Sequence, residues 1–285
     1  MLKPAKTLTD EEMIHQYVLD MQWRELSKTT VYMRETYLNK FSREVGFRTA
    51  TKENVQAWLS RDSLKPQSRA IWLTSIHCFY AFANKRGFFD KVKDERGYDV
   101  DFDPTSDIAK PKAKKGRPHP IPNADLELAL KWATPDMKCW LLIGALCGCR
   151  CCEIATIRRE DVNDGALEPW LNIEFGKGGK QRAVPLHPDV IAALNDYGMR
   201  DAGPLWDINA QQMSRAINDH LHSLGIKSTA HALRHFFGTN IYRSCLDLQL
   251  TADLLGHSNT AITSVYAASD RRKAAGVVGS LSISG

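Results

Sequence analysis

The sequence has no apolar run that could cross a membrane. Its longest nearly uninterrupted apolar stretch covers eleven residues, 139–149, and includes two glycines, whereas a membrane-spanning helix needs about 20 apolar residues. The first residues, MLKPAKTLTDEEM, lack the apolar segment of a secretory signal peptide. These absences argue against a membrane-spanning or secreted protein, and we expect an intracellular protein that works away from membranes.

Cysteine is too sparse for a disulfide-bonded or zinc-binding scaffold. The chain has seven cysteines among 285 residues, an odd number, and four of them stand together at 147, 149, 151 and 152. The others, Cys78, Cys139 and Cys245, do not provide the second ligand pair that a structural zinc site needs. Small secreted proteins with disulfides usually carry an even and dense set. We therefore predict reduced thiols, most of them packed in the interior.

Net charge differs between the two parts of the chain, although the total is only +5. Residues 1–117 contain 22 Lys and Arg against 16 Asp and Glu, a net charge of +6. Residues 118–285 contain 16 against 17, a net charge of −1. A basic first part favours a polyanionic partner such as nucleic acid, and an ordinary solvated surface is the alternative.

Apolar residues at helical spacing predict four helices in the first part of the chain. Asp10 and Thr51 stand where they can cap helix starts, and Gly46 and Gly87 stand where they can end helices. The expected helices cover residues 10–26, 29–45, 51–59 and 67–85. Residues 90–107 contain seven acidic residues and little periodicity, which indicates an exposed segment or an insertion.

A basic, proline-containing segment, KPKAKKGRPHPIP at residues 110–122, is predicted to link two domains because its prolines disfavour helix. Its cations could lie along a phosphate backbone or be simply solvated; they are Lys110, Lys112, Lys114, Lys115 and Arg117. Beyond the linker, two short strands at 170–175 and 181–186 are expected around a glycine-rich turn. Asn123 is expected to cap the first helix there. The expected helices cover 123–133, 136–147, 151–157, 188–196, 209–224, 230–243, 247–255 and 259–268.

Several segments of the second domain carry residues suited to chemistry on an anion. Arg150 follows an apolar helix and a glycine, and Glu153 lies about one helical turn later, so we expect the two to pair. A purely structural pair is the alternative. Lys177 stands at the hairpin tip, where most lysines are only solvated. His231 and Arg234 share a helix face, and one guanidinium can bind two phosphate oxygens.

The last of these segments reads LLGHSNTAITSVY, residues 254–266. Gly256 is expected to end one helix, and Tyr266 lies about two turns into the next, nine residues after His257. A tyrosine at such a position usually packs against its neighbours. Each segment alone is weak support for a function.

Together these segments resemble the catalytic boxes of the tyrosine recombinase, or phage integrase, family. The chain contains an Arg-x-x-Glu box, a Gly-Lys-Gly hairpin, a His-x-Leu-Arg-His box and a Leu-Gly-His…Tyr box within about residues 120–268. The matching residues are Arg150, Lys177, His231, Arg234, His257 and Tyr266. Two local departures are Cys-Gly-Cys-Arg, where Thr-Gly-Leu-Arg is commoner, and Ala-Ala after the tyrosine, where a histidine often stands second.

The resemblance implies a mainly α fold with a small β-sheet. It implies an N-terminal four-helix core-binding (SAM-like) domain at 1–109, the linker at 110–122 and a C-terminal mixed α/β catalytic domain at 123–268. A tail at 269–285 is expected to dock on a neighbouring protomer, and a frayed terminus is the alternative. Because the first helix begins near residue 10, we expect no arm-binding domain before it, as in a short integrase or an Xer-like enzyme.

The resemblance also implies a mechanism. Tyr266 attacks a DNA phosphodiester and forms a covalent 3′-phosphotyrosine. Arg150 and Arg234 bind the non-bridging oxygens, while His231 and His257 donate hydrogen bonds or take the tyrosine proton. Lys177 is the expected acid for the leaving 5′-oxygen, and Glu153 the expected positioning partner of Arg150 or a histidine.

Two rivals to these assignments come from the sequence itself. Lys180 competes with Lys177, and Tyr242 competes with Tyr266, although we expect Tyr242 to pack. One phosphodiester replaces another of similar energy, so no cofactor, metal or ATP is expected. The sequence agrees, because it contains neither a P-loop nor an acidic metal-binding cluster.

The expected partners are double-stranded DNA attachment sites, further copies of the chain in a tetrameric synapse, and a directionality or host factor. The expected location is the cytoplasm or nucleoid of a bacterial host cell. The favoured role is integration or excision of a phage or mobile element. The alternatives are Xer-like dimer resolution, type IB topoisomerase-like relaxation of DNA, and a non-catalytic DNA-binding regulator.

Overall fold

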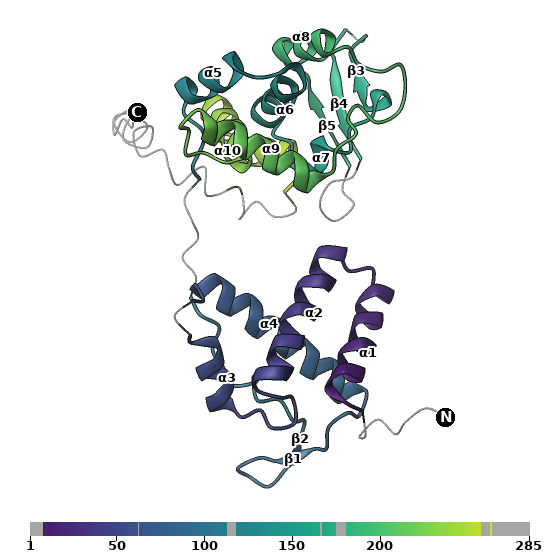
Figure 1. The fold of residues 1–285 in the computed structure, drawn as a ribbon, viewed down its shortest axis with the longest axis vertical. Helices are drawn as coiled ribbons and strands as arrows, with labels where there is room; N and C mark the ends of the chain where they lie inside the picture. Colours follow the sequence, from purple (N-terminus) through teal and green to yellow (C-terminus); the bar gives the residue numbers. More distant parts are fainter. Residues whose placement is uncertain are drawn as a thin grey trace, which may run out of the picture. The chain divides into compact units, whose positions relative to one another are not determined.

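The structure is a computed structural model that describes residues 8–61, 63–112, 118–165, 167–174, 181–257 and 263. The chain divides into two compact units, unit 1 (Met1–Lys115) and unit 2 (Gly116–Gly285), each with its own hydrophobic core. The boundary lies inside the segment 110–122 that the sequence predicts to be a linker. Figure 1 shows both units with their helices and strands labelled.

Unit 1 contains the four helices predicted from the apolar spacing, α1 (Asp10–Trp23), α2 (Lys28–Glu44), α3 (Lys52–Leu59) and α4 (Pro66–Lys85). Thr51 caps α3 as predicted, and a proline begins α4. The cap of α1 is Thr9 and not the predicted Asp10, because Thr9 forms a capping box with Glu12 and Asp10 is already the first helical residue. Aromatic side chains fill the space between the helices. Tyr80 is fully buried there and donates its hydroxyl to the Phe47 carbonyl at 2.8 Å.

The acidic segment after α4 is more structured than the sequence predicts. It contains an antiparallel hairpin of β1 (Val92–Lys93) and β2 (Asp99–Val100), whose four residues are exposed. Phe102 then packs against the core of unit 1, and Thr105 is buried. This contact could not be predicted from the sequence, because a single apolar residue among acidic residues gives no periodic pattern.

Unit 2 is built around a helix that is buried on all sides. This helix, α6 (Pro135–Leu146), packs against α8 (Pro188–Tyr197) and α10 (Ala230–Cys245). A helix that is apolar all round belongs in the interior. The other helices among the described residues of unit 2 are α5 (Asn123–Lys131), α7 (Cys151–Ile154), α9 (Ala210–Ser223) and α11 (Leu248–Leu255), with a 3₁₀ turn at Arg159–Asp161.

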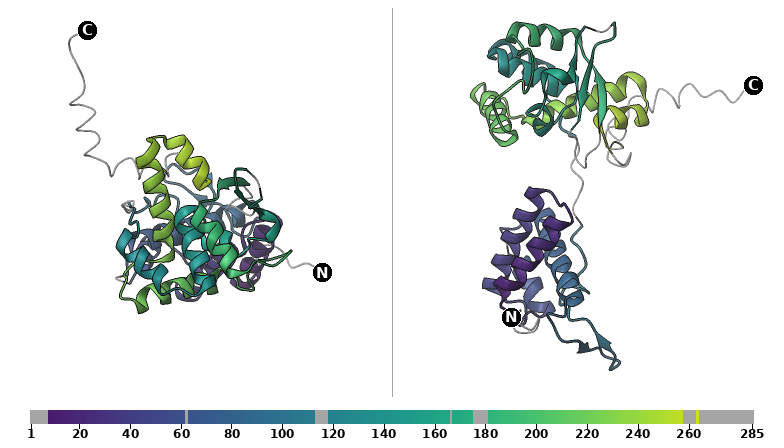
Figure 2. Two further views of the ribbon diagram at one scale, coloured as in Figure 1. Left: turned by 90° about the horizontal axis from the view of Figure 1, so that it is seen from above. Right: turned by 90° about the vertical axis from the view of Figure 1, so that its right-hand side faces the viewer.

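The sheet of unit 2 has three antiparallel strands in the order β3-β4-β5, one more than predicted. The strands are β3 (Val162–Asn163), β4 (Trp170–Ile173) and β5 (Arg182–Pro185). Strand β3 could not be predicted from the sequence, because two residues are too few to show an alternating pattern. Strand β5 lies beside α11, as Figure 2 shows, and this contact brings the predicted hairpin close to the Leu-Gly-His segment.

Two smaller predictions about unit 2 are wrong. Pro122, not Asn123, is the cap residue of α5, because the extended backbone of the proline already precedes the first helical turn. Helix α7 ends at Ile154 instead of continuing to 157, since the chain turns there toward the 3₁₀ turn and β3.

The cysteines carry free thiols, as the sequence predicts. Cys139, Cys147 and Cys149 are buried, Cys78 and Cys151 are half-buried, and the other two are exposed. Burial raises the pKa of the Cys139 thiol to about 12. The interior thiols therefore act as packing groups and stay protonated at neutral pH.

Candidate active site

A single buried carboxylate organises the candidate site. Glu153 lies in the first turn of α7 and is 1% exposed. It accepts the backbone N–H of Arg150 at Oε2 (2.8 Å) and the Arg150 Nη1 at Oε1 (2.7 Å). The predicted pair therefore forms. It also caps the N-terminus of α7, since Arg150 is the N-cap residue of this helix.

Arg182 is the second guanidinium on this carboxylate, and the sequence analysis missed it. Its Nη1 and Nη2 donate to Glu153 Oε1 (3.1 Å) and Oε2 (2.8 Å), and its Nε donates to the Leu254 carbonyl (2.9 Å). A signal existed, because Arg182 shares a strand face with the buried Val184 and Leu186. A cation on the inner face of a strand needs a buried anion.

Arg234 is the third arginine beside Glu153. It lies on α10, is 2% exposed, and approaches Glu153 Oε2 to 3.8 Å through Nη1. Its Nη1 donates to the Gly148 carbonyl and its Nη2 to the Leu255 carbonyl, each at 2.5 Å. Arg234 thus links α10 to the loop before Arg150 and to the end of α11.

Two glycines of the predicted boxes are required by the geometry around these arginines. Gly148 has φ +66°, and a Cβ there would lie 2.4 Å from the Phe237 ring. Gly256 has φ +63°, and a Cβ there would lie 2.9 Å from Arg182 Nη1. Positive φ strains any residue with a Cβ. Glycine therefore lets the backbone approach both α10 and the Arg182 guanidinium.

The histidines of the predicted boxes come from α10 and from the turn after α11. His231 and His235 lie one helical turn apart on α10, and their rings meet edge to face at 4.6 Å between centroids. His257 Nδ1 lies 2.9 Å from the hydroxyl of the fully buried Thr263. Thr263 is a second residue that the sequence analysis missed, because threonine within a helical pattern carries no chemical signal of its own.

The electrostatics favour an ionised Glu153 and neutral histidines. Burial alone would raise the pKa of Glu153, but the hydrogen bonds and charge of Arg182, together with Arg150, outweigh it and lower that pKa to about 2. Burial, followed by the charges of Arg234, Arg150 and Arg182, lowers the pKa of His257 to about 4. Burial and two of the same arginines also lower the pKa of His231.

The depressed histidine pKa should appear in the pH dependence of stability. Below the ordinary pKa of 6.5, an unfolded chain gains a proton at His257 that the folded chain does not bind until about pH 4. The stability that His257 contributes is therefore present above pH 6.5 and lost as the pH falls from 6.5 toward 4. We predict that His257→Gln flattens the decline in unfolding free energy across this window, measured by urea unfolding.

The control for this prediction is His15→Gln, which changes an exposed histidine on α1. The control should keep the slope of the parent chain between pH 6.5 and 4. An unchanged slope in His257→Gln would contradict the assignment of a neutral, desolvated imidazole.

Several predicted site residues lie outside the described residues. These are Lys177, its rival Lys180, the proposed nucleophile Tyr266, the tail at 269–285 and the linker cations Lys114, Lys115 and Arg117. Lys110 and Lys112 are described and exposed. The rival tyrosine, Tyr242, is half-buried and packs against the core of unit 2, as expected.

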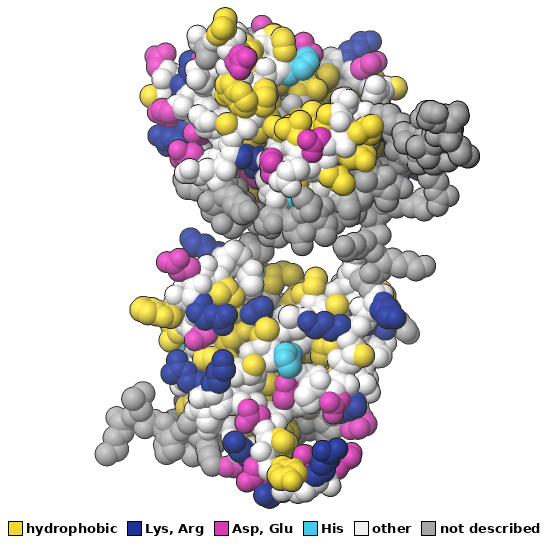
Figure 3. Space-filling model, turned by 180° about the vertical axis from the view of Figure 1, so that it is seen from behind, with side chains coloured by type: hydrophobic (Ala, Val, Ile, Leu, Met, Phe, Trp, Pro, Cys, Tyr) yellow, Lys and Arg dark blue, Asp and Glu magenta, His cyan; other side chains and the backbone are white. Residues whose placement is uncertain are grey.

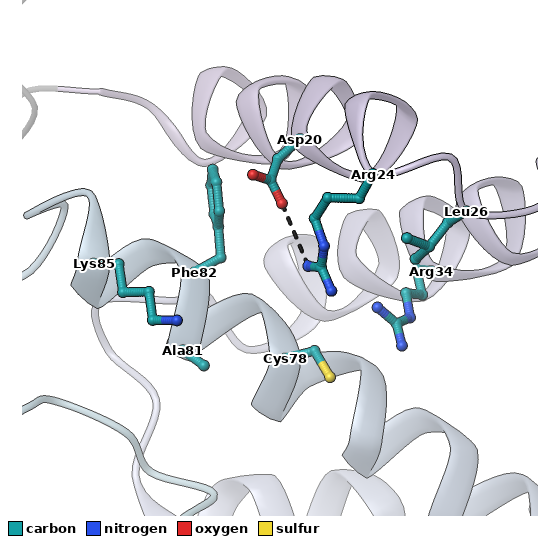
Figure 4. Close-up of a pocket in the computed structure, with 8 residues that line it drawn as sticks. All are labelled: Asp20, Arg24, Leu26, Arg34, Cys78, Ala81, Phe82 and Lys85. Carbon is teal, nitrogen blue, oxygen red and sulfur yellow. Dashed lines mark hydrogen bonds and ion pairs between the residues drawn. The ribbon is translucent and has the colours of Figure 1, made fainter.

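Unit 1 carries a separate cationic pocket of about 530 Å³ between α1, α2 and α4. Figure 4 shows its lining, in which Arg24, Arg34 and Lys85 face a space that also contains the carboxylate of Asp20. Arg24 pairs with Asp20 at 3.5 Å, and Arg34 donates to the hydroxyl of Tyr17 at 3.0 Å. Figure 3 shows several Lys and Arg side chains on one face of unit 1.

The described part of the chain contains neither a metal centre nor a membrane span. No three His, Cys, Asp or Glu side chains among the described residues come together as a metal site. None of the helices within the described ranges is both long and apolar enough to cross a bilayer.

Comparison with known proteins provides matches across both units. A family model described as the phage integrase family matches residues 129–273. Tyrosine recombinase XerD of Pseudomonas aeruginosa is 28% identical over 235 residues, covering 74% of each chain. Tyrosine recombinase XerA of Pyrococcus horikoshii is 21% identical over 282 residues, covering 93% of this chain and 92% of the relative.

Solved structures share the fold at low identity. The XerH site-specific recombinase in a post-cleavage complex with a palindromic difH substrate has a TM-score of 0.70 and 17% identity, covering 98% of this chain and 99% of that one. A lambda integrase (75–356) dimer bound to a COC′ core site has a TM-score of 0.70 and 17% identity, covering 91% and 95%.

Proposed function

This chain belongs to the phage integrase family and is a tyrosine recombinase, and from that premise we propose that it cuts and rejoins duplex DNA at specific sites through a covalent 3′-phosphotyrosine. The observation that carries the proposal is the cluster of Arg150, Arg182 and Arg234 around the single carboxylate of Glu153. Three guanidinium groups and one carboxylate leave a net charge of about +2 in the site, which suits a bound phosphodiester.

The exposure of the three arginines suggests which of them reaches the phosphate first. The side chain of Arg150 is 22% exposed, whereas those of Arg182 and Arg234 are 8% and 3% exposed. We assign Arg150 to the surface of the site as the entry contact for a non-bridging oxygen. Arg234 lies beneath it and supplies the second positive charge as negative charge builds on the five-coordinate phosphorus.

The nucleophile assigned to this site is the hydroxyl of Tyr266. Its oxygen forms a bond to phosphorus while the bond from phosphorus to the 5′-oxygen breaks, so the number of phosphodiester bonds is conserved. Thr263, whose hydroxyl lies 2.9 Å from His257 Nδ1, stands three residues before Tyr266 in the sequence. The reverse reaction, with a new 5′-hydroxyl as nucleophile, rejoins the strand.

Proton transfer is assigned to the histidines and to Lys177. A free tyrosine has a pKa of about 10, so its proton must leave as the oxygen attacks. The lowered pKa of His257 and His231 keeps both imidazoles neutral at pH 7, which is the state that can accept this proton. Lys177 is assigned as the acid that protonates the leaving 5′-oxygen, with Lys180 as its rival.

Binding of the duplex is assigned to both units and to the linker between them. We assign phosphate oxygens to the cationic pocket of unit 1, and the exposed Lys110 and Lys112 provide further cations for the backbone. Recombination exchanges strands between two duplexes, and each of the four cut strands needs its own nucleophile. We therefore propose that four copies assemble on two sites. The lambda integrase tetramer bound to a Holliday junction, with a TM-score of 0.69, supports this by likeness of fold.

The biological role that we propose is integration or excision of a phage or mobile element, acting on DNA in the cytoplasm of a bacterial host. A second role, resolution of chromosome dimers, is supported by the Xer-type names of the curated relatives. The two roles predict different targets, because one joins an element to its host and the other acts on a chromosomal site.

Covalent capture tests the proposed function. The whole chain is incubated with fragmented host and element DNA, denatured with SDS, and the DNA that remains attached to protein is sequenced. Adducts at a few sequences are expected, at element ends for integration or at one chromosomal site for dimer resolution. Adducts without sequence preference would indicate a type IB topoisomerase-like activity, and DNA binding without any adduct would indicate a regulator.

A further inference from the structure

We infer that Arg182 is a positioning residue for the cleavage reaction, one that acts by holding Glu153 in the orientation that places Arg150 on the phosphate. The inference rests on the proposed function. Arg182 is 8% exposed in its side chain and Arg150 is 22% exposed, so Arg182 reaches Glu153 from the protein interior and Arg150 from the surface.

The hydrogen bonds of Arg182 fix the orientation of the Glu153 carboxylate. Its two terminal nitrogens bind both oxygens of Glu153, at 3.1 and 2.8 Å, in the bidentate arrangement that fixes the plane of a carboxylate. Arg150 uses the same two oxygens, one from its backbone N–H and one from Nη1. The plane set by Arg182 therefore determines where the Arg150 guanidinium lies.

Arg182 also connects segments that are distant in sequence. It is the first residue of β5, and its backbone pairs with Ile173 of β4. Its Nε holds the carbonyl of Leu254, and its guanidinium packs over Gly256, immediately before His257. One side chain thus joins the hairpin strands, the start of α7 and the end of α11.

Replacement of this arginine should slow chemistry more than it weakens DNA binding. A misplacement of about 1 Å at a reacting group costs roughly 100-fold in rate. In Arg182→Gln we expect the single-turnover rate of adduct formation to fall about 100-fold. The affinity for the same duplex should change less than about threefold, because Arg182 is not on the surface that meets DNA.

The measurement uses a duplex carrying a junction sequence captured with the parent chain. Arg159→Gln is the matched control, since Arg159 is half-buried and also binds a carboxylate, Asp164, and a backbone carbonyl, that of Val162, away from the site. The control should react at the parent rate. An Arg182→Gln rate equal to that of the control would overturn the inference.

A conservative variant separates positioning from folding. Arg182→Lys keeps a buried positive charge beside Glu153 but removes the bidentate contact with its two carboxylate oxygens. We expect this variant to melt cooperatively and to react about 100-fold more slowly than the parent chain. The parent rate in folded Arg182→Lys would overturn the inference in favour of a structural ion pair.

A substrate with sulfur in place of the scissile 5′-oxygen tests which step is affected. Sulfur leaves without needing a proton, so a defect in the general acid disappears on this substrate. Arg182→Gln should stay about 100-fold slow on it, and recovery there would overturn the inference. No adduct from the parent chain on any DNA would overturn the proposed function itself, a result distinct from the three that would overturn the inference.

Discussion

Tyr266→Phe should abolish the covalent protein–DNA adduct while DNA binding remains within about twofold of the parent chain. The change removes only the phenolic oxygen, which is the atom that forms the bond to phosphorus. Removal of a nucleophile typically costs several orders of magnitude in rate, so we expect a fall of at least about 1000-fold. The readout is the band that survives SDS, with affinity measured by gel shift on the same duplex.

Tyr242→Phe is the control for this experiment. Tyr242 lies on α10, eight residues after Arg234, and packs against the core of unit 2. Tyr242 has the same phenolic hydroxyl as Tyr266, but it lies outside the Leu-Gly-His…Tyr box. Its replacement should therefore leave the adduct intact. An adduct that persists in Tyr266→Phe and vanishes in Tyr242→Phe would reassign the nucleophile. Loss of DNA binding in Tyr266→Phe would point to a structural role for the hydroxyl.

Glu153→Gln should be the most destabilising single neutralisation in the candidate site. The parent carboxylate is buried and balances three guanidinium groups, at 2.7, 2.8 and 3.8 Å. Its pKa is lowered from 4.5 to about 2 despite burial, which would raise it, because the hydrogen bonds and charge of Arg182 and Arg150 favour the ionised form. This difference corresponds to about 3 kcal/mol of unfolding free energy at pH 7.

The stability difference between the parent chain and Glu153→Gln should depend on pH. A carboxylate with a lowered folded pKa contributes stability above its unfolded pKa of 4.5, and the contribution disappears as the pH falls toward 2. The difference between parent and Glu153→Gln should therefore be about 3 kcal/mol at pH 7 and shrink below pH 4.5. Equilibrium urea unfolding of the full chain, followed through the transition of unit 2, measures it.

Glu127→Gln is the matched control, because Glu127 is exposed on α5. It should change the unfolding free energy by less than about 0.5 kcal/mol at any pH. A difference between parent and Glu153→Gln that stays constant from pH 7 to pH 2 would mean that the lost stability comes from packing and not from the charge of Glu153.

The helices could be predicted from the sequence because their signals are local. Apolar residues three and four positions apart mark the buried faces of α1, α2 and α4, and Thr51 marks the start of α3. Short elements carry no comparable signal. Strand β3 and the β1–β2 strands contain two residues each, and what stabilises them is pairing with a partner strand.

The pairing of Arg150 with Glu153 was also predictable, since a helical turn brings residues three apart together. The order of Arg150, His231, Arg234 and His257 along the chain, with the spacing inside each box, is enough to indicate the family. Each box is a local pattern, and a match of several boxes in order is specific even when each box alone is common.

Only the tertiary structure revealed that Glu153 serves three arginines and that Arg182 joins the site. Arg182 lies 29 residues from Glu153 and 72 from Leu254, its two partners. No local spacing brings such residues together. The packing of β5 beside α11 and the contact of the Arg182 side chain with Glu153 of α7 do so. The sequence by itself determined which chemical groups are present and where the longer helices of the described residues form. The tertiary structure decided which groups share one buried carboxylate, because burial and long-range contact depend on the whole fold.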